Sequence, residues 1–113
     1  MEFGLTEEVL NKIKEIAEKY GKYQFKIFGS RAKNTYNKTS DIDIAVFENV
    51  SNDDEFKIKN DMDLLDIIYK IDLVFINEKT KKCFLEEIQK EGVNLLWKDL
   101  KKESKILLML LTD

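Results

Sequence analysis

A chain of 113 residues is long enough for one domain with a single modest core, and its 43% hydrophobic and 36% charged residues are typical of a globular protein. The formal net charge of −3 argues against nucleic acid as the main partner, because a phosphate backbone is bound by a basic surface. One cysteine and no histidine exclude a disulfide framework, a serine–histidine triad and the usual zinc sites, and favour a reducing cytoplasm.

The N-terminal part of the chain predicts a helix followed by a strand. Apolar residues recur at helical spacing between Thr6, a candidate N-cap, and Gly21, which suits the position after a helix end. Residues 23–28 are predicted to form a strand that leads into Gly29-Ser30. A Gly-Ser turn between a strand and a helix offers backbone N–H groups and a hydroxyl to the phosphates of a nucleotide.

A short helix is predicted over residues 30–36, with its N-terminus directed at the phosphates. Arg31 and Lys33 are candidates for contacts with a triphosphate, and the alternative for both is a solvated helix face. Both interpretations remain open at this point.

Two aspartates open the next predicted strand, residues 42–47. Residues i and i+2 of a strand point to the same face, so Asp41 and Asp43 are expected to stand side by side. Adjacent carboxylates repel each other unless a cation lies between them, and Mg²⁺ prefers such oxygen ligands. Asp72 opens a third predicted strand, residues 71–77. If the two strands are neighbours, three carboxylates can hold two metal ions roughly 3.5–4 Å apart.

The remaining segments continue the alternation of helices and strands. Helices are predicted over residues 54–65, 79–91 and 98–111, and a fourth strand over residues 93–97. Alternating elements without a linker predict one α/β domain, and the spacing alone favours a parallel sheet. Residues 106–111 are all apolar, which predicts either an interface or a segment folded back over the sheet.

The spacing of these polar residues resembles a known signature. Gly29-Ser30, ten further residues and the pair Asp41 and Asp43, with Asp72 opening a later strand, resemble the motif of the DNA polymerase beta-type nucleotidyltransferases. In length the chain is similar to the minimal nucleotidyltransferases of prokaryotes, which are stand-alone catalytic domains.

The resemblance implies an α/β (α+β) fold with one small mixed sheet of about four strands and flanking helices. Its first two strands are antiparallel, in contrast to the parallel sheet that spacing alone favours. A single nucleotidyltransferase domain is expected over residues 1–113, with a catalytic core of about 8–97. The chain departs from the family pattern at Lys33-Asn34, where members often carry Arg-Gly. Asparagine tolerates positive φ better than most residues, so the turn can survive.

The resemblance also implies a function. Minimal nucleotidyltransferases use Mg²⁺ to transfer a nucleoside monophosphate, here AMP from ATP, and some modify a tyrosine hydroxyl of a HEPN-domain toxin as its antitoxin. In this chain Asp41 and Asp43 would hold the metal ions, and Asp72 would complete the second metal site and serve the attacking hydroxyl. Gly29 and Ser30 would bind the phosphates.

Two other functions compete with this one. The protein could be a catalytically silent antitoxin that neutralises its partner by binding, although three clustered carboxylates without a metal cost stability. A small-molecule nucleotidyltransferase of the aminoglycoside-modifying kind ranks last, because the chain has no second domain to bind the drug. Residues 48–66 hold an excess of five negative charges, which would repel a phosphate backbone. No membrane segment is expected, and homo-oligomerisation is left open.

Overall fold

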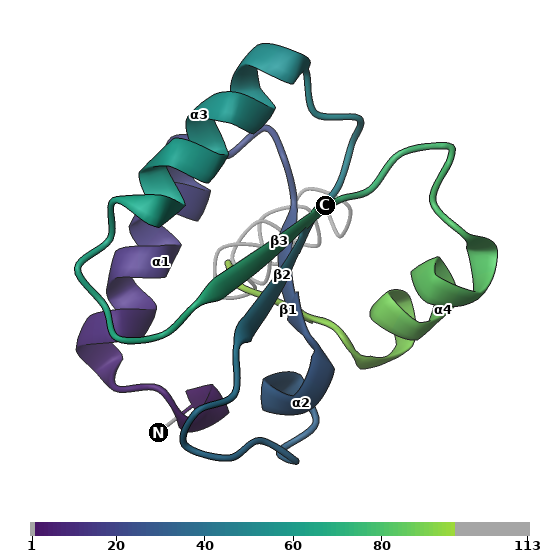
Figure 1. The fold of residues 1–113 in the computed structure, drawn as a ribbon. Coiled ribbons are helices and arrows are strands. Elements are labelled where there is room, and N and C mark those ends of the chain that lie inside the picture. The colour runs from purple at the N-terminus through teal and green to yellow at the C-terminus, as the bar shows by residue number, and fades with distance from the viewer. Residues whose placement is uncertain (1, 97–113) are drawn as a thin grey trace, which may run out of the picture.

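The computed structural model describes residues 2–96 as a four-stranded sheet with helices on both sides (Figure 1). The predicted helix over residues 98–111, with its apolar run, lies outside the described residues. The elements in chain order are the 3₁₀ turn η1 (Glu2–Gly4), α1 (Glu7–Lys19), β1 (Phe25–Phe28), α2 (Gly29–Ala32), β2 (Ile42–Val46), α3 (Asn52–Asp63), β3 (Ile71–Phe75), α4 (Lys82–Glu91) and β4 (Val93–Asn94).

The sheet is mixed, as the family resemblance implied. Its strand order is β3-β2-β1-β4, with β1 antiparallel to both β2 and β4 and with β2 parallel to β3. The parallel sheet favoured by spacing is therefore wrong for β1 and β2, because their connection contains only the four-residue helix α2. A parallel crossover needs a dozen or more residues and usually a full helix. The connection between β2 and β3 meets that requirement through α3.

The two faces of the sheet differ in what covers them. Helices α1 and α3 lie on one face, and α4 lies on the other (Figure 1). The α1/α3 face holds the main core, where Ile27, Ile42 and Ile44 are completely buried. On the α4 face, Ala45 and Ile88 form the centre of a second, smaller cluster. Burial of one such large aliphatic side chain is worth about 1.5–3 kcal/mol, so the α1/α3 face dominates stability.

Two tyrosine–aspartate hydrogen bonds fasten α3 to the end of α1 and the segment after it. The Tyr20 hydroxyl donates to Asp61 Oδ2 at 2.6 Å, and the Tyr23 hydroxyl donates to Asp54 Oδ2 at 2.5 Å. Both hydrogen bonds lower the pKa of their aspartate. A lysine pairs with each aspartate as well, at 3.0 Å for Lys19 with Asp61 and at 3.1 Å for Lys22 with Asp54.

Capping side chains set several element boundaries. The prediction that Thr6 caps α1 is confirmed, because its hydroxyl accepts from the Val9 N–H. Helix α3 begins two residues earlier than predicted, because Ser51 caps it in the same way. Helix α4 begins only at Lys82, since residues 77–80 form a turn closed by the Asn77 and Thr80 side chains.

Two shorter elements also differ from the prediction. Helix α2 ends at Ala32 instead of continuing to residue 36, because Asn34 adopts φ 61° and leaves the helical conformation. The expectation that Asn34 would tolerate positive φ is thereby confirmed. Strand β4 has only two residues, since the Asn94 side chain accepts from the Leu96 N–H and turns the chain.

Candidate active site

Asp43 and Asp72 occupy adjacent positions on two neighbouring parallel strands. The register pairs Asp43 of β2 with Asp72 of β3, next to the pair Ile42 and Ile71. Cross-strand partners point to the same face, so both carboxylates lie on the α4 face while the two isoleucines lie on the α1/α3 face. The condition that these two strands are neighbours is met, and the fold brings the carboxylates of Asp43 and Asp72 together.

Asp41 lies one residue before β2, and its backbone is held on both sides. On one side, the Ser40 carbonyl accepts two hydrogen bonds from Arg31, at 3.1 and 2.8 Å. On the other, the Ile42 N–H donates to the Lys70 carbonyl at 2.9 Å. The position of Asp41 therefore depends on two other segments of the chain rather than on β2 alone.

Gly29 approaches Asp43 from the neighbouring strand β1. Phe28, the last residue of β1, pairs with Asp43, so Gly29 follows directly beside that carboxylate. Gly29 has φ +72°, and a Cβ atom at this position would collide with Asp43 Oδ2. Both the backbone conformation and the lack of space require glycine here. Ser30 follows as the second residue of α2, so the predicted Gly-Ser turn lies beside Asp43.

The carboxylates influence one another electrostatically. The pKa of Asp43 is raised, first because the side chain is partly buried and then because of the negative charges of Asp72 and Asp41. Within residues 2–96 no lysine or arginine forms an ion pair with Asp41 or Asp43. Asp72 has a weak partner, since its Oδ1 lies 3.5 Å from Lys70 Nζ at an exposed position. The site thus concentrates negative charge that a cation would neutralise.

The donor set suits magnesium, but it is not assembled as a coordination shell. In the part of the chain that the structure describes, no three His, Cys, Asp or Glu side chains are grouped so as to hold a metal ion. Carboxylate oxygens are nevertheless the ligands that Mg²⁺ prefers. The pKa of Asp43 is raised first by burial and then by repulsion from Asp72 and Asp41, and a cation would offset both effects. A metal ion bound by both Asp43 and Asp72 would compete with Lys70 for the Asp72 carboxylate.

The expectation that Arg31 lies on a solvated helix face or contacts the triphosphate is not supported by its position. Its side chain is only 1% exposed, and its donors are directed at the main-chain carbonyls of Ser40 and Phe3. These bonds and its burial leave it no surface to offer a nucleotide. Helical periodicity could not reveal this, because the partners come from the loop after α2 and from the N-terminal turn.

Lys33 remains accessible beside the Gly-Ser turn. Its Nζ lies 3.6 Å from Glu91 Oε2 at the end of α4, and its side chain is 41% exposed. An exposed pair of this kind contributes little to stability, so it can open when a phosphate approaches. Glu91 was not among the residues predicted for the site. Only the packing of α4 beside α2 brings it there, and nothing in its sequence context indicates it.

Comparison with known protein families gives a match for most of the chain. Residues 11–101 match the family described as "Polymerase beta, Nucleotidyltransferase". The chain belongs to this family. The polymerase beta nucleotidyltransferase membership confirms the resemblance drawn from the Gly-Ser and Asp-x-Asp spacing, and the mixed sheet confirms the fold class.

Two solved structures share the fold of this nucleotidyltransferase domain. One is a toxin–antitoxin crystal structure with AMP-PNP, which has 20% sequence identity and a TM-score of 0.59. The other is the toxin–antitoxin MntA-HpeT in a form with two Asp-to-Glu substitutions, which has 18% identity and a TM-score of 0.58. Each match covers 92% of this chain and 98% of the other. No curated protein matches the chain. Within residues 2–96, no helix combines the length and apolar character needed to cross a bilayer.

Proposed function

We propose that this protein is a Mg²⁺-dependent nucleotidyltransferase that transfers AMP from ATP to a hydroxyl of a HEPN-domain toxin, and so acts as a cytoplasmic antitoxin. The observation that carries the proposal is the position of Asp43, which stands beside Asp72 on the next strand and against Gly29 of the Gly-Ser turn. Family membership supports the reaction type. The toxin–antitoxin structures, one of them with AMP-PNP, support the nucleotide and the class of partner.

Each side chain of the site has a role in this reaction. Asp41 and Asp43 would hold the magnesium ions, and Asp72 would share in the second site. When bound, magnesium neutralises charge on the transferring phosphoryl group and on the leaving group. In the MntA-HpeT structure the two substituted aspartates are also separated by one residue, which supports the assignment of the Asp41 and Asp43 pair.

The Gly-Ser turn would bind the phosphates. The conformation of Gly29 allows the backbone to approach the triphosphate closely, and the Ser30 hydroxyl adds a donor. Lys33 would exchange its contact with Glu91 for a contact with the triphosphate.

In the transfer itself, a hydroxyl oxygen of the acceptor attacks the α-phosphorus of ATP. A new bond forms between this oxygen and the α-phosphorus. The bond between the α-phosphorus and the oxygen that bridges it to the β-phosphorus breaks, and pyrophosphate leaves. Asp72 stands on β3, one strand further from the Gly-Ser turn than Asp43 does. We assign it to orienting the hydroxyl, whose proton passes to this carboxylate or to solvent.

The whole chain is proposed to form one domain, with a catalytic core of about residues 8–97. Recognition of the acceptor is proposed to depend on the partner protein itself.

Labelled ATP tests the proposal directly. The protein is incubated with a candidate HEPN-domain partner, Mg²⁺ and [α-³²P]ATP, and the label on the partner is measured. The double variant Asp41→Asn with Asp43→Asn should lose transfer, whereas Asp63→Asn, an exposed aspartate at the end of α3, should retain it. Equal labelling by the double variant and the wild type would show that the carboxylate pair is not the active site.

A catalytically silent antitoxin is the second candidate. The observation in its favour is the lack of a preformed group of three metal-binding side chains within residues 2–96. The two functions differ in what the double variant does to the toxin. A silent antitoxin would still suppress toxin activity after both aspartates are changed, whereas an enzymatic antitoxin would lose suppression together with transfer.

A further inference from the structure

Arg31 is the largest fully buried side chain among residues 2–96. All three guanidinium nitrogens donate to main-chain carbonyls. Nε and Nη2 donate to Ser40 O at 3.1 and 2.8 Å, and Nη1 donates to Phe3 O at 2.9 Å. The guanidinium also lies against two aromatic rings, with its central carbon 4.6 Å from the centre of Tyr69 and 5.2 Å from that of Tyr36. Its hydrogen bonds thus run to the backbone, and its positive charge lies over two tyrosine rings.

The partners of Arg31 belong to the segments that carry the site. The Ser40 carbonyl is part of the peptide bond to Asp41, so two hydrogen bonds restrain the peptide that positions this carboxylate. Tyr69 precedes Lys70, whose carbonyl accepts from the N–H of Ile42 at the start of β2. Arg31 itself lies two residues after Gly29. One side chain therefore connects the Gly-Ser turn, the entry to β2 and the approach to β3.

The N-terminal turn closes over this arrangement. The Phe3 carbonyl faces Nη1, and the next residue, Gly4, has φ +69°. A Cβ atom on Gly4 would collide with the ring of Tyr36, so the turn packs directly against one of the two stacking rings. The residues before α1 thus help to exclude water from the guanidinium.

We propose that Arg31 is a positioning residue, which sets the distance between the Gly-Ser turn and Asp41 and thereby the affinity of the site for a divalent cation. This inference rests on the proposed function. Lysine carries the same charge but cannot place two parallel hydrogen bonds on one carbonyl while a planar group stacks on tyrosine. Arg31→Lys should therefore retain the charge and lose the alignment.

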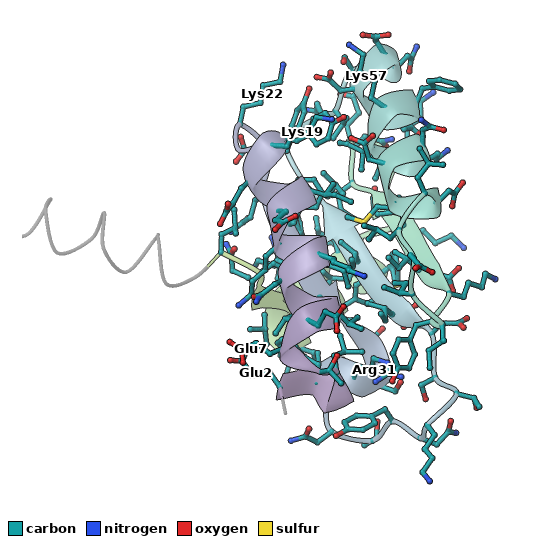
Figure 2. The ribbon with its side chains drawn as sticks, turned by 90° about the vertical axis from the view of Figure 1, so that its left-hand side faces the viewer. Glu2, Glu7, Lys19, Lys22, Arg31 and Lys57 are labelled. Carbon is teal, nitrogen blue, oxygen red and sulfur yellow. The ribbon has the colours of Figure 1, made fainter. Side chains whose placement is uncertain are left out.

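Manganese binding tests the inference without requiring catalysis. The dissociation constant of Mn²⁺ is measured by electron paramagnetic resonance for the wild type, Arg31→Lys and a control, Tyr20→Phe. Figure 2 shows Lys19, the neighbour of Tyr20, at the end of the molecule opposite Arg31, so the control changes stability away from the site. Each protein is measured at the same interval below its own melting temperature, which removes the effect of general destabilisation.

Arg31→Lys is expected to weaken Mn²⁺ binding by roughly 10-fold to 100-fold, the usual effect of losing a group that orients metal ligands. Tyr20→Phe should bind as the wild type does. If Arg31→Lys is less stable yet binds Mn²⁺ as tightly as the control, Arg31 only supports the fold and the inference is wrong. If the wild type binds no Mn²⁺, the proposed function fails and the inference fails with it.

A second variant covers the case in which Arg31→Lys does not fold. Tyr69→Leu removes one stacking ring and leaves every hydrogen bond of the guanidinium possible. A severalfold weaker affinity for Mn²⁺ in this variant supports the positioning role. An unchanged affinity in Tyr69→Leu overturns it, because the guanidinium would then not need its aromatic support to set the site.

Discussion

At the scale of single residues, the contact between Gly29 and Asp43 leaves no room for a side chain at position 29. We predict that Gly29→Ala costs about 1–3 kcal/mol through its left-handed backbone alone and also displaces the Asp43 carboxylate. Metal-dependent stabilisation, measured as the shift in melting temperature on addition of Mg²⁺, should be lost in this variant.

Gly21→Ala is the matched control for that substitution. Gly21 is exposed, and its φ lies outside the left-handed region. Gly21→Ala should therefore leave the Mg²⁺-dependent shift in melting temperature unchanged. A normal response in Gly29→Ala would mean that the carboxylate can move aside without harm to the site.

The raised pKa of Asp43 predicts how the metal-free protein responds to pH. The folded state holds the Asp43 proton more tightly than the unfolded chain does, because burial and the charges of Asp72 and Asp41 disfavour ionisation. Its contribution to the free energy of unfolding is therefore fully present below the ordinary pKa of 3.8 and is lost as pH rises through the raised value. Urea denaturation in EDTA should show this decline in the wild type and a smaller decline in Asp43→Asn.

Asp54 and Asp61 provide an internal contrast in the same titration. Their pKa values are lowered, mainly by hydrogen bonds from Tyr23 and Tyr20, so their contribution is present above the ordinary pKa and is lost as pH falls through the lowered values. The two effects act on opposite sides of pH 3.8 and can be separated. Parallel curves for wild type and Asp43→Asn above that pH would contradict the assigned repulsion.

The residues of the site differ in how far sequence alone could identify them. Asp41, Asp43 and Gly29 follow from local rules, since strands alternate with period two and a tight turn favours glycine. Arg31 does not follow from any local rule. Its position on α2 is compatible with a solvated face, and its burial depends on tyrosines and carbonyls contributed by other segments.

At the scale of elements, the junction between α1 and α3 is the best place to test stability separately from function. We predict that Tyr20→Phe lowers the free energy of unfolding by roughly 1 kcal/mol or less, because its hydrogen bond to Asp61 is near the surface. Tyr23→Phe should destabilise in the same direction, and the double variant should be additive, since each hydroxyl reaches a different aspartate.

Urea denaturation of the two single variants and the double variant measures this additivity. Mg²⁺ binding should be unchanged in all three, because both hydrogen bonds lie on the α1/α3 side of the sheet, away from Asp43 and Asp72. A large coupling energy would show that α3 docks onto α1 as one unit instead of through two separate contacts.

The existence of most elements could be predicted, but their boundaries could not. Hydrophobic periodicity reports which face of a helix or strand is buried, and that pattern held for α1, α4 and the alternation in β2. Boundaries depend on individual caps and turns. Because Ser51 caps α3, this helix begins earlier than predicted, and because Asn77 and Thr80 close a turn, α4 begins later. Periodicity carries no information about either boundary.

At the scale of the whole molecule, ligand binding should stabilise the fold by mass action. At a Mg²⁺ concentration one hundred times its dissociation constant, binding adds about 2.7 kcal/mol, which corresponds to a rise of roughly 10 °C in melting temperature for a domain of this size. We predict this rise for the wild type, and a larger one with an ATP analogue that cannot be hydrolysed. Asp41→Asn with Asp43→Asn should abolish it.

Asp72→Asn should behave differently, because Asp72 is assigned mainly to the acceptor hydroxyl. It should abolish transfer while retaining much of the affinity for the nucleotide. Isothermal titration with the same analogue compares the two variants. Equal loss of affinity in both would contradict this division of roles.

The direction of the strands could not be predicted from the spacing of the elements alone. The alternation of helices and strands indicated a parallel sheet, and only the short connection after Gly29 and the family resemblance pointed to an antiparallel pair. That pair turns the end of β1 toward the start of β2, so Gly29 meets Asp43. Sheet topology therefore decided the site geometry, and helical or strand periodicity carries no information about strand direction.

The pairing of Asp43 with Asp72 also limits which insertions and deletions the protein can accept. A one-residue slip of β3 against β2 would bring an apolar residue beside Asp43. It would also move the partly buried apolar side chains of β3 out of the core, so such a slip would be strongly destabilising. Residues 47–70 are constrained by packing, because they contain α3, whose Ile58 and Met62 lie in the core, and they include Tyr69, which lies against Arg31. Residues 33–40 are constrained by the hydrogen bonds from Arg31 to the Ser40 carbonyl. The length of residues 33–40 therefore determines how far Asp41 lies from the Gly-Ser turn.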